Sequence, residues 1–480
     1  MRNFITTPIY YVNDKPHIGH LYTTILADLF SRYKRLKGEE VFFQSGTDEN
    51  GLNIVRIAEK NNKNVKEFVD EISKEFKALK EKFNLSLDNF IRTTSEEHKN
   101  GVYKLWDLCK NDIYIDKYEG KYCLSCEAYY QDEEIIDNLC PIHKRPLENF
   151  SEKNYFFKLT KYLDEIKGLI EENRIKIIPN EIRIQILDII RGRKLKDLSI
   201  SRDAERSKGW GIKVPNDDSQ IIYVWFDALT NYLSGLGFGS NNEENYKKFW
   251  EDGKIFHFIG KDIAKFHSIY WPAFLISAGL KTPDYIICNY FILNEGEKIS
   301  KTLGNMITVE DLLKDFNYEF VRYYLITQGT EFKDWSFSWE HYKEVYEGEL
   351  KNEIGNLASR IFGLLKNMPF DKLVLDKNLL ENDLKDVENV YEDRFENFEF
   401  SKAYKNVFSF VKRLNRFIDE KRIWESKNED DYKTLIINLD KIAKFYLPLL
   451  PESMEKILIV LDLKNNIFEN KRINFEPLFK

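Results

Sequence analysis

The chain has 480 residues, which is too many for one hydrophobic core, so we expect roughly two to four domains. Its composition, 43% hydrophobic and 31% charged, is that of a globular protein and excludes a disordered chain. The net charge of −7 excludes a protein that coats nucleic acid indiscriminately, but it leaves room for a local basic patch that docks one RNA.

Further features of the sequence bear on the compartment. No run of about 18 apolar residues is present, so nothing in the chain is expected to span a membrane. The N-terminus enters a predicted strand directly and carries no signal-peptide pattern. The five cysteines are too few for a disulfide framework in a chain of this length. Together these features predict a cytoplasmic protein with no membrane partner.

A strand, a turn and a helix are predicted at the N-terminus. Residues 3–12 are mostly β-branched and aromatic, which favours a strand, and the turn that follows ends in Pro16, a typical first residue of a helix. Apolar residues then recur at helical spacing. His17 and His20 open this helix, where free N–H groups and the helix dipole favour phosphate, and Gly19 lets a ligand approach the backbone. The alternative is that both histidines are ordinary polar caps.

The next segments continue the alternation of strands and helices. A strand at 40–44 leads into a polar turn that contains Asp48, a helix with an apolar stripe follows at 65–83, and another strand follows at 90–93. This alternation predicts a parallel sheet, and ligands bind at the carboxyl ends of the strands in such sheets. The turn at 16–20 and Asp48 both lie at that edge, which is a first indication of an active site.

The alternation breaks near residue 114 and resumes with a predicted strand at 221–226, so the simplest account is a sheet domain interrupted by an insertion. Further strands at 254–260 and 285–288 are expected to complete the sheet. From about residue 345 only helical periodicity remains, which predicts a separate helical bundle.

Four candidate metal ligands cluster in the insertion. Cys123 and Cys126 form one C-x-x-C pair, and thirteen residues later Cys140 and His143 form a C-x-x-H pair. Three thiolates and an imidazole at this spacing make a closed tetrahedral set for Zn²⁺, and because no position is left for water the site should be structural. Zinc would hold together an insertion too small to bury much core. The alternative is that these are reduced cysteines buried as small hydrophobic residues, which is what we expect of the two other cysteines.

A second phosphate-binding loop is predicted after the last parallel strand. Its sequence is Lys298-Ile299-Ser300-Lys301-Thr302. Two lysines that bracket a serine suit a polyphosphate whose charge increases as a leaving group departs. A surface turn with solvated lysines is the more common reading of such a loop alone, but its combination with the histidine turn favours phosphate chemistry.

At these two motifs the chain resembles the class I aminoacyl-tRNA synthetases. The stretch from His17 to His20 is similar to their HIGH signature, and residues 298–302 are similar to their KMSKS signature. Further blocks in the same order narrow the resemblance to the methionyl-tRNA synthetase family, and the cysteine cluster resembles the single zinc knuckle of its bacterial-type branch. These blocks are residues 7–13, 46–51, 201–203, 223–229, 260–263 with Phe266 and His267, and 356–360.

The resemblance implies an α/β fold with a Rossmann-type parallel sheet, a zinc-knuckle insertion and a C-terminal α-helical anticodon-binding bundle. The expected divisions are the first half of the catalytic domain at 1–114, the connective insertion at 115–215, the second half of the catalytic domain at 216–290, the lysine loop and stem-contact region at 291–344, and the helical anticodon-binding domain at 345–480.

The resemblance also implies the reaction. Methionine and ATP would form methionyl-adenylate and pyrophosphate, and the methionyl group would then move to the terminal adenosine of tRNA(Met), releasing AMP. Such adenylation needs little covalent help from the protein, because it depends on neutralising phosphate charge and holding the carboxylate in line. By analogy, His17 and His20 donate to the phosphates, and Lys298 and Lys301 clamp the leaving pyrophosphate with Mg²⁺.

The site residues that the resemblance implies fall into three further groups. The ATP-binding residues are His17, Gly19, His20, Lys298, Ser300 and Lys301. The methionine-binding residues are Ile9, Tyr11, Asp48, Trp225, Ala228, Tyr232, Ile263, Phe266 and His267, where Asp48 pairs with the substrate ammonium and the apolar and aromatic residues surround the thioether. Plain core packing is the alternative for Trp225 and Phe266.

The anticodon-reading residues implied by the resemblance are Asn356, Arg360 and Trp424. Unpaired anticodon bases can be stacked on an aromatic side chain and hydrogen-bonded at their edges. Nearby, an apolar stripe faces away from a basic one at helical spacing, which suits contact with the tRNA backbone, although a solvated helix face is more common. The apolar stripe is Val407, Phe410, Val411, Leu414 and Ile418, and the basic face is Lys402, Lys405, Lys412, Arg413 and Arg416.

The sequence departs from the family pattern at a few positions. Asn50 stands where the family usually has His, Ile423 replaces the proline that commonly precedes the anticodon tryptophan, and Ile299 and Thr302 are mild variants in the lysine loop. The chain also ends with the bundle and lacks the appended C-terminal domain that makes some relatives dimers, so we expect a monomer.

Two other functions remain open at this point. The first is another class I synthetase, for cysteine or a branched aliphatic amino acid, although an insertion of about 100 residues leaves little room for an editing domain. In the cysteine enzymes a catalytic zinc lies in the amino acid pocket, whereas here the candidate ligands lie in the insertion. The second is a non-catalytic tRNA-binding paralogue, which would be expected to have lost one of the motif residues.

Overall fold

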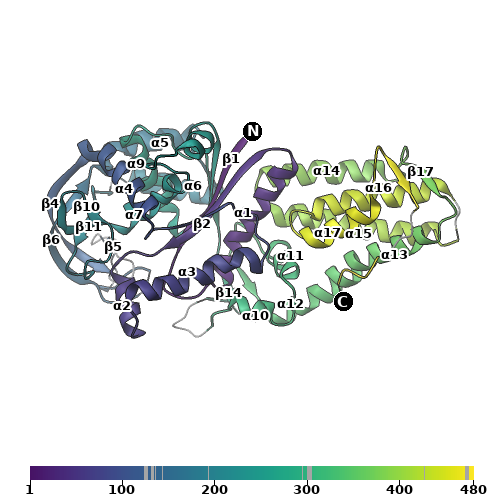
Figure 1. Ribbon diagram of the computed structural model, residues 1–480, viewed down its shortest axis with the longest axis horizontal. Helices are drawn as coiled ribbons and strands as arrows, with labels where there is room; N and C mark the ends of the chain where they lie inside the picture. Colours follow the sequence, from purple (N-terminus) through teal and green to yellow (C-terminus); the bar gives the residue numbers. More distant parts are fainter. Residues whose placement is uncertain are drawn as a thin grey trace. The chain divides into compact units, whose positions relative to one another are not determined.

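A computed structural model describes residues 1–123, 128–130, 135, 137–142, 144–192, 194–294, 296–299, 305–425, 428–470 and 475–479. The chain divides into two compact units, Met1–Asn289 and Tyr290–Lys480. The first contains a large sheet with helices, and the second is mainly helical (Figure 1).

Six parallel strands form the main sheet of the first unit, in the order β3-β2-β1-β12-β13-β7. Their bounds are Arg2–Tyr11 (β1), Glu40–Asp48 (β2), Asn89–Arg92 (β3), Lys176–Ile178 (β7), Lys254–Gly260 (β12) and Tyr285–Asn289 (β13). The central strands are buried almost throughout, as expected when helices cover both faces of a parallel sheet. The predicted α/β class with a parallel sheet is therefore confirmed.

Helices connect these strands in the manner that the sequence predicts. The helices of the first half are α1 (Ile18–Leu36), α2 (Leu52–Lys60), α3 (Val65–Lys82) and α4 (Glu96–Cys109). The helix α1 connects β1 to β2 and buries its apolar residues. Asn64 caps the N-terminus of α3, and its side chain accepts a hydrogen bond from Lys66 N. The strands predicted at 3–12, 40–44 and 90–93 and the helix predicted at 65–83 are confirmed.

The strand predicted at 221–226 is wrong in its second half and in its partners. The strand β11 (Asp217–Ile222) lies in a small antiparallel sheet between β10 (Lys213–Val214) and β9 (Ser201–Asp203), not in the parallel sheet. The helix α7 (Val224–Leu229) follows directly, then α8 (Asn231–Ser234). A run of β-branched and aromatic residues carries no information about where a strand must stop, and here burial of Phe226 and Leu229 favours the helix.

Between β3 and β12 in the sequence, the chain forms a separate antiparallel sheet. Its order is β5-β4-β6-β8, with bounds Ile113–Cys123 (β4), Ala128–Tyr130 (β5), Glu148–Phe157 (β6) and Leu198–Ser199 (β8). The helices α5 (Leu163–Glu171) and α6 (Asn180–Arg191) flank β7, which is an edge strand of the parallel sheet. A part of the segment expected to be an insertion thus belongs to the main sheet.

A helical segment between β12 and β13 carries several predicted site residues. A π-helical turn at Phe266–Tyr270 continues into α9 (Trp271–Ser277). Another π-helical segment, Tyr246–Glu251, precedes β12.

The second unit begins with a small sheet and continues as helices. The sheet order is β15-β14-β16, with bounds Ile292–Asn294 (β14), Glu297–Lys298 (β15) and Trp335–Phe337 (β16). The helices are α10 (Val309–Leu313), α11 (Tyr318–Gln328), α12 (Trp339–Val345), α13 (Asn356–Lys366), α14 (Glu381–Glu396), α15 (Phe400–Lys421), α16 (Glu429–Tyr446) and α17 (Pro451–Leu461), and β17 (Lys372–Val374) pairs with β18 (Ile467–Glu469).

Two buried charges on α11 fasten the α16–α17 turn. The Glu319 carboxylate accepts hydrogen bonds from Glu452 N and Ser453 N, 2.8 and 3.1 Å away, at the start of α17. The Arg322 guanidinium donates to the carbonyl oxygens of Pro448 and Leu449, each at 2.9 Å, just after α16 ends. Each charge thus meets the helix end of opposite partial charge, which stabilises a buried ionic group.

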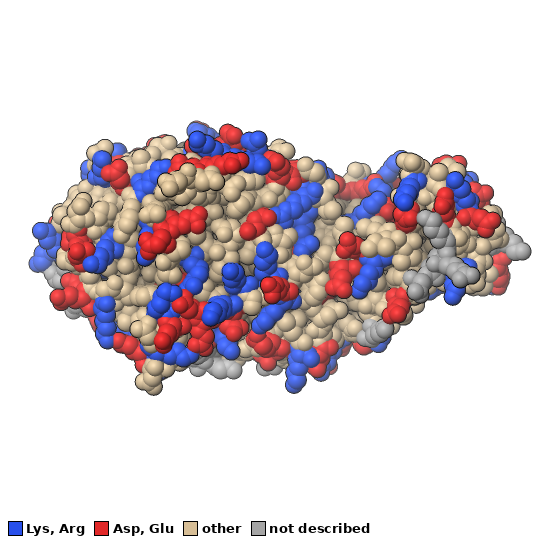
Figure 2. All heavy atoms as spheres, in the orientation of Figure 1, with Lys and Arg blue, Asp and Glu red and all other residues tan. Residues whose placement is uncertain are grey.

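Charges of both signs are interspersed on the face drawn in Figure 2, in keeping with the net charge of −7. Across the ranges given above, no helix combines the length and the apolar character needed to cross a bilayer.

Candidate active site

The two motif histidines lie at the N-terminus of α1, at the carboxyl end of β1. His17 is the N-cap residue, and its Nδ1 accepts a hydrogen bond from Gly19 N at 3.0 Å. The Nδ1 of His20 accepts from His17 N at 3.3 Å, and the two rings stack 3.8 Å apart. A nitrogen that accepts a backbone N–H carries no proton, so we assign the proton of each ring to Nε2.

Both rings are neutral near pH 7. Burial lowers the pKa of His17 to about 4, and burial together with the neighbouring His17 holds the pKa of His20 well below its usual range. Each ring therefore presents an Nε2–H donor and no positive charge at the helix N-terminus. Such donors, fixed in advance by their Nδ1 contacts, can stabilise negative charge on phosphate oxygens.

The lysine loop belongs to the second unit. Lys298 ends β15, which pairs with β14, and Ile299 follows it. Ser300, Lys301 and Thr302 lie outside the described residues, as does the side chain of Lys298.

An aromatic cluster brings together four of the predicted methionine-binding residues. The rings of Trp225 in α7 and Phe266 stack with centroids 3.7 Å apart and planes 4° apart. Tyr232 donates its hydroxyl hydrogen bond to His267 Nε2 at 2.7 Å, since His267 Nδ1 donates to the Ile263 carbonyl at 3.0 Å. Burial lowers the pKa of His267 to about 4 and raises the pKa of Tyr232, so both groups are neutral.

A further buried histidine, which the sequence did not single out, supports this cluster from β12. The ring of His257 lies 4.1 Å from the ring of Tyr232, and His257 Nδ1 is 2.8 Å from Thr6 Oγ1. Burial, followed by the nearby His267, holds the pKa of His257 well below its usual range. The phenol of Tyr232 is therefore held between two neutral imidazoles.

Three other predicted methionine-binding residues lie at the carboxyl edge of the parallel sheet. Tyr11 is paired with Asp48 in the β1–β2 register, and Ile9 is paired with Gly46. A Cβ atom on Gly46 would lie 2.2 Å from the Ile91 carbonyl oxygen, so only glycine fits where the strands approach this closely. Ala228 is buried in α7, on the same helix as Trp225.

A buried polar chain connects this sheet edge to α7. Asn50 Nδ2 donates to Asp227 Oδ2 at 2.7 Å, and Asp227 Oδ1 is 2.6 Å from His98 Nε2. His98 Nδ1 is in turn 2.8 Å from Ser234 Oγ in α8. Asp227, His98 and Ser234 are fully buried. The loop that follows Asp48 is thereby fixed to the helix that carries Trp225 and Ala228.

The neighbour of Asp48 is held equally firmly. The buried Glu49 carboxylate accepts hydrogen bonds from Thr47 Oγ1 at 2.7 Å and from Arg92 Nε and Nη2 at 2.6 and 3.0 Å. Its backbone N–H donates to Thr93 Oγ1 at 2.9 Å. The sequence motifs did not identify these partners of Glu49, although a charged residue directly after a buried strand indicates that it needs a partner.

The predicted anticodon residues lie at the surface of the second unit. Asn356 begins α13, and Arg360 one turn later donates to Asn415 Oδ1 at 3.2 Å and forms an ion pair with Asp419 on α15. Trp424 follows α15 and is 55% exposed. These side chains are accessible to a large partner.

The helix α15 has the two faces that the sequence predicts. The apolar stripe from Val407 to Ile418 is buried, and the basic residues are exposed or half-buried. Two of those cations are already paired, since Lys402 is 2.5 Å from Glu399 and Arg413 is 3.2 Å from Glu420.

Two of the predicted zinc ligands are described. Cys123 at the end of β4 and Cys140 are buried in one cluster with Leu147. The turn after Cys140 closes on it, because Lys144 N donates to the Cys140 carbonyl at 2.9 Å and Cys140 N donates to the Arg145 carbonyl at 2.8 Å. Cys126 and His143 lie outside the described part of the chain, and within that part no group of three potential ligands gathers. One thiol from each pair in a shared buried cluster fits a common metal.

Comparisons with known proteins agree with one another. A family model described as tRNA synthetases class I (M) matches residues 3–149 and 133–362. A methionine--tRNA ligase of Fusobacterium nucleatum is 36% identical over 482 residues, which cover 97% of this chain and 75% of the relative. A methionine--tRNA ligase of Thermotoga maritima is 36% identical over 95% of this chain and 75% of its own.

Solved structures that resemble this chain are of the same kind of protein as these sequence relatives. The structure of the Mycobacterium tuberculosis methionyl-tRNA synthetase bound by methionyl-adenylate matches with a TM-score of 0.91 and 30% identity and covers all of both chains. The free form of the same protein matches with a TM-score of 0.79 over 97% of this chain and 92% of that one. With the histidine-bearing helix start, the aromatic cluster and the six-stranded parallel sheet in place, the chain belongs to the methionyl-tRNA synthetase family.

Proposed function

We propose that the chain ligates L-methionine to tRNA(Met) at the expense of ATP. A methionine carboxylate oxygen attacks the α-phosphorus of ATP, the bond to the leaving pyrophosphate breaks, and methionyl-adenylate forms. A hydroxyl of the terminal adenosine of tRNA then attacks the methionyl carbonyl, and AMP leaves. The match to a relative bound by methionyl-adenylate supports this reaction, and the paired neutral histidines at the start of α1 are the observation that carries it.

At the phosphates, the chain would supply fixed donors. His17 and His20 would donate from Nε2 to the phosphate oxygens, where negative charge increases in the transition state, and the backbone at Gly19 would lie against the nucleotide. Lys298, Ser300 and Lys301 would bind the departing pyrophosphate. Mg²⁺ bound with ATP would neutralise part of the phosphate charge.

At the amino acid, Asp48 would pair with the ammonium group, and Ile9, Tyr11 and Ala228 would line the side-chain pocket. Trp225 and Phe266 offer aromatic faces and edges, which suit a polarisable thioether. Tyr232, Ile263 and His267 form a hydrogen-bonded chain, so the Tyr232 hydroxyl and both His267 nitrogens already have partners where an apolar side chain would bind.

At the anticodon, Arg360 and Asn356 would hydrogen-bond to base edges and the exposed Trp424 would stack on a base. We further propose that the chain acts as a monomer in the cytoplasm, with the divisions expected from the sequence, except that β7 within 115–215 belongs to the parallel sheet of the catalytic domain. In their support, β1, β2 and β3 come from 1–114 and β12 and β13 come from 216–290, yet all lie in one sheet.

A structural zinc ion held by Cys123, Cys126, Cys140 and His143 would stabilise the region around β4 and β5 and would take no part in the chemistry. Replacing Cys140 by Ser should abolish bound zinc, measured by elemental analysis of the purified protein. Replacing the buried Cys109, which lies in α4, should leave the zinc content unchanged. Equal zinc contents in both variants would contradict the proposed ligand set.

The function is tested by amino-acid-dependent ATP–pyrophosphate exchange, with each of the twenty amino acids assayed separately and no tRNA present. Exchange with methionine alone is expected. Exchange with cysteine or a branched aliphatic amino acid would keep the reaction class and refute the pocket. A lack of exchange with any amino acid, from folded protein, would favour a tRNA-binding protein without catalysis.

A further inference from the structure

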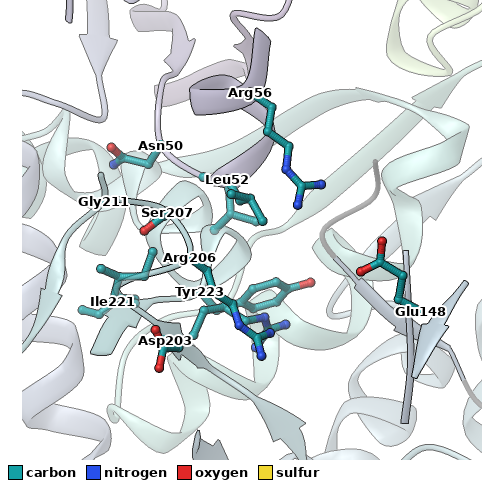
Figure 3. Close-up of a pocket in the computed structure, with 14 residues that line it drawn as sticks. Asn50, Leu52, Arg56, Glu148, Asp203, Arg206, Ser207, Gly211, Ile221 and Tyr223 are labelled. Atoms are coloured by element: carbon teal, nitrogen blue, oxygen red, sulfur yellow. The ribbon is translucent and has the colours of Figure 1, made fainter. Parts of the chain in front are cut away.

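A pocket of about 260 Å³ lies between the start of α2 and the small sheet of β9 and β11 (Figure 3). Leu52 lies near its centre in the view, Arg56 points down from α2, and Arg206 and Tyr223 face it from the other side. Asn50 also lines it, two residues after Asp48, and Val224 does so directly before Trp225. The pocket therefore adjoins the residues proposed to bind methionine, but it contains none of them.

The walls of the pocket are held apart by fixed contacts. Lys208 in the turn after β9 forms an ion pair with Glu59 of α2. Trp210 Nε1 donates to the Glu49 carbonyl at 2.8 Å, and Asn50 donates to the buried Asp227. These contacts join both walls, so the pocket exists before any ligand binds.

Cations outnumber carboxylates in the lining. Arg56, Arg202 and Arg206 contribute positive charge, and Asp203 and Glu148 contribute negative charge. An excess of one positive charge suits a ligand with a single negative charge, such as a phosphodiester, better than a triphosphate. Leu52 and the buried Ile221 and Ile222 form an apolar part of the wall, which can cover one face of a base.

The arginines that line the pocket differ in whether they already contact other residues of the chain. Arg202 donates to the carbonyl oxygens of Ser199 and Ser201, at 3.2 and 2.6 Å, and its guanidinium lies 4.2 Å above the Tyr223 ring. Arg56 is exposed and forms no hydrogen bond or ion pair with any residue that the structure describes. Arg56 is thus the cation available to an incoming ligand.

We propose that this pocket receives one phosphodiester and the adjoining unstacked base of the unpaired 3′ end of tRNA, with Arg56 on the phosphate. The inference rests on the proposed function, since the terminal adenosine must reach the methionyl carbonyl beside Asp48 and the nucleotides before it must pass close by. A single-stranded nucleotide needs a cation for its backbone and an apolar surface for its base, and the pocket offers both.

The test compares the effect of one substitution on the binding of two RNA ligands. Binding is measured by competition with a tRNA(Met) that ends in 3′-deoxyadenosine and with the same tRNA shortened by its last three nucleotides. The variant Arg56→Ala should bind the full-length RNA about tenfold more weakly and the shortened RNA within about twofold of the unsubstituted protein. The slope of log affinity against log salt for the full-length RNA should become shallower by about 0.7, the value for one phosphate contact of a single strand.

Two further variants serve as controls. Lys60→Ala removes an exposed cation from the same helix that does not line the pocket, and it should leave both affinities unchanged. Arg56→Lys keeps the positive charge and should restore most of the lost affinity. The methionine-dependent exchange of Arg56→Ala should match that of the unsubstituted protein, because that half-reaction contains no tRNA.

The results that would contradict the proposal can be told apart. Equal losses with both RNAs would place Arg56 on another part of tRNA and overturn the proposal, as would unchanged affinity for both. Loss of exchange in Arg56→Ala would make it part of the adenylation site instead. If the unsubstituted protein showed no exchange and no charging, the proposed function would fail, independently of the RNA comparison.

Discussion

The cluster around Tyr232 and the surface around Arg360 meet their proposed ligands in opposite ways. Tyr232 and His267 are almost fully buried, and their polar atoms are joined in a chain of hydrogen bonds. Arg360 forms a surface ion pair with Asp419, and Trp424 is largely open to solvent. A small substrate can be selected by groups fixed in advance, whereas a base of a large RNA must be met by groups that exchange one partner for another.

The largest effect should come from breaking the buried side at Asp227. The substitution Asp227→Ala leaves His98 Nε2 and Asn50 Nδ2 without their acceptor in a fully buried site. A buried hydrogen-bonding group that loses its partner costs about 1–3 kcal/mol, and two such donors lose theirs here. We expect the midpoint of urea unfolding of the full chain to fall accordingly. The KM for methionine in the exchange assay should rise, because α7, which carries Trp225, loses its hydrogen bonds to Asn50 and His98.

Asp107→Ala is the matched control, since Asp107 lies on the exposed side of α4 and forms a surface ion pair with Lys110. Its effect on the free energy of unfolding should stay below about 0.5 kcal/mol. If Asp227→Ala unfolded at the same urea concentration as the unsubstituted chain, the polar chain would not be the element that fixes the Asp48 loop to α7.

The second effect is a pH dependence from the same cluster. The pKa of His267 is about 4 in the folded chain because of burial, and about 6.5 when the chain is unfolded. Between these pH values His267 is protonated in the unfolded chain but not in the folded chain. The free energy of unfolding should therefore fall as the pH falls from 6.5 to 4, by up to about 3 kcal/mol. Urea titrations at several pH values should show a flatter dependence for His267→Asn.

A buried carboxyl in the second unit provides a contrast of opposite sign. Burial raises the pKa of Glu331 to about 7, although Ser401 N and Oγ donate to it at 2.7 and 2.8 Å. The folded chain then holds a proton between about pH 4.5 and 7 that the unfolded chain releases, so this group costs stability as the pH rises. Glu331→Gln should remove that cost and leave the His267 dependence intact. A shared change in both variants would mean that neither group titrates as its burial implies.

A smaller effect is expected at the hydroxyl of Tyr232. The substitution Tyr232→Phe deprives His267 Nε2 of its donor and leaves a buried acceptor unsatisfied, at a cost of about 1–3 kcal/mol. The KM for methionine should rise about tenfold while the KM for ATP stays within about twofold, both measured by exchange. Tyr246→Phe alters a buried tyrosine elsewhere in the same unit and should change neither constant. An equal rise in both KM values would show a general distortion rather than a role in the amino acid pocket.

The local parts of this fold follow from the sequence. The strand that ends near Tyr11, the turn at Pro16 and the helix opened by His17 depend on neighbouring residues, so pattern and turn chemistry predict them. The strand expected at 221–226 failed because its first residues pair with β9 while the next ones pack as α7. That choice depends on tertiary contacts, which a local pattern does not contain.

The candidate site also contains residues that the sequence predicts and residues that it does not. The residues in contiguous motifs could be named in advance, but the partners that hold them could not. His98 and Asp227 are 129 positions apart, and Thr6 and His257 are 251 apart. Nothing in the sequence around His98 distinguishes it from an ordinary polar residue at the start of a helix. Only the fold brings such pairs together, so the residues that support a site are the hardest to predict from sequence.

The smallest effect, and the one that separates the two regions most clearly, is expected at Asp419. Its ion pair with Arg360 is solvent-exposed and should contribute about 0–1 kcal/mol, so Asp419→Ala should leave the unfolding midpoint nearly unchanged. Arg360 must leave Asp419 to reach a base, and removing a carboxylate also reduces repulsion of the RNA backbone. The KM for tRNA should therefore fall about two- to fivefold at low salt, and the gain should fade as salt screens the charges.

Asp386→Ala removes an exposed carboxylate from α14, in the same unit, and serves as the control for overall charge. If it lowered the KM for tRNA as much as Asp419→Ala, the gain would come from net charge and not from freeing Arg360. If Asp419→Ala raised the KM, Asp419 itself would contact the RNA, and the exposed face would be as fixed in advance as the buried one. A gain from removing a partner is the outcome that a preformed site such as the Tyr232 cluster cannot produce, because there every removal leaves a buried group unsatisfied.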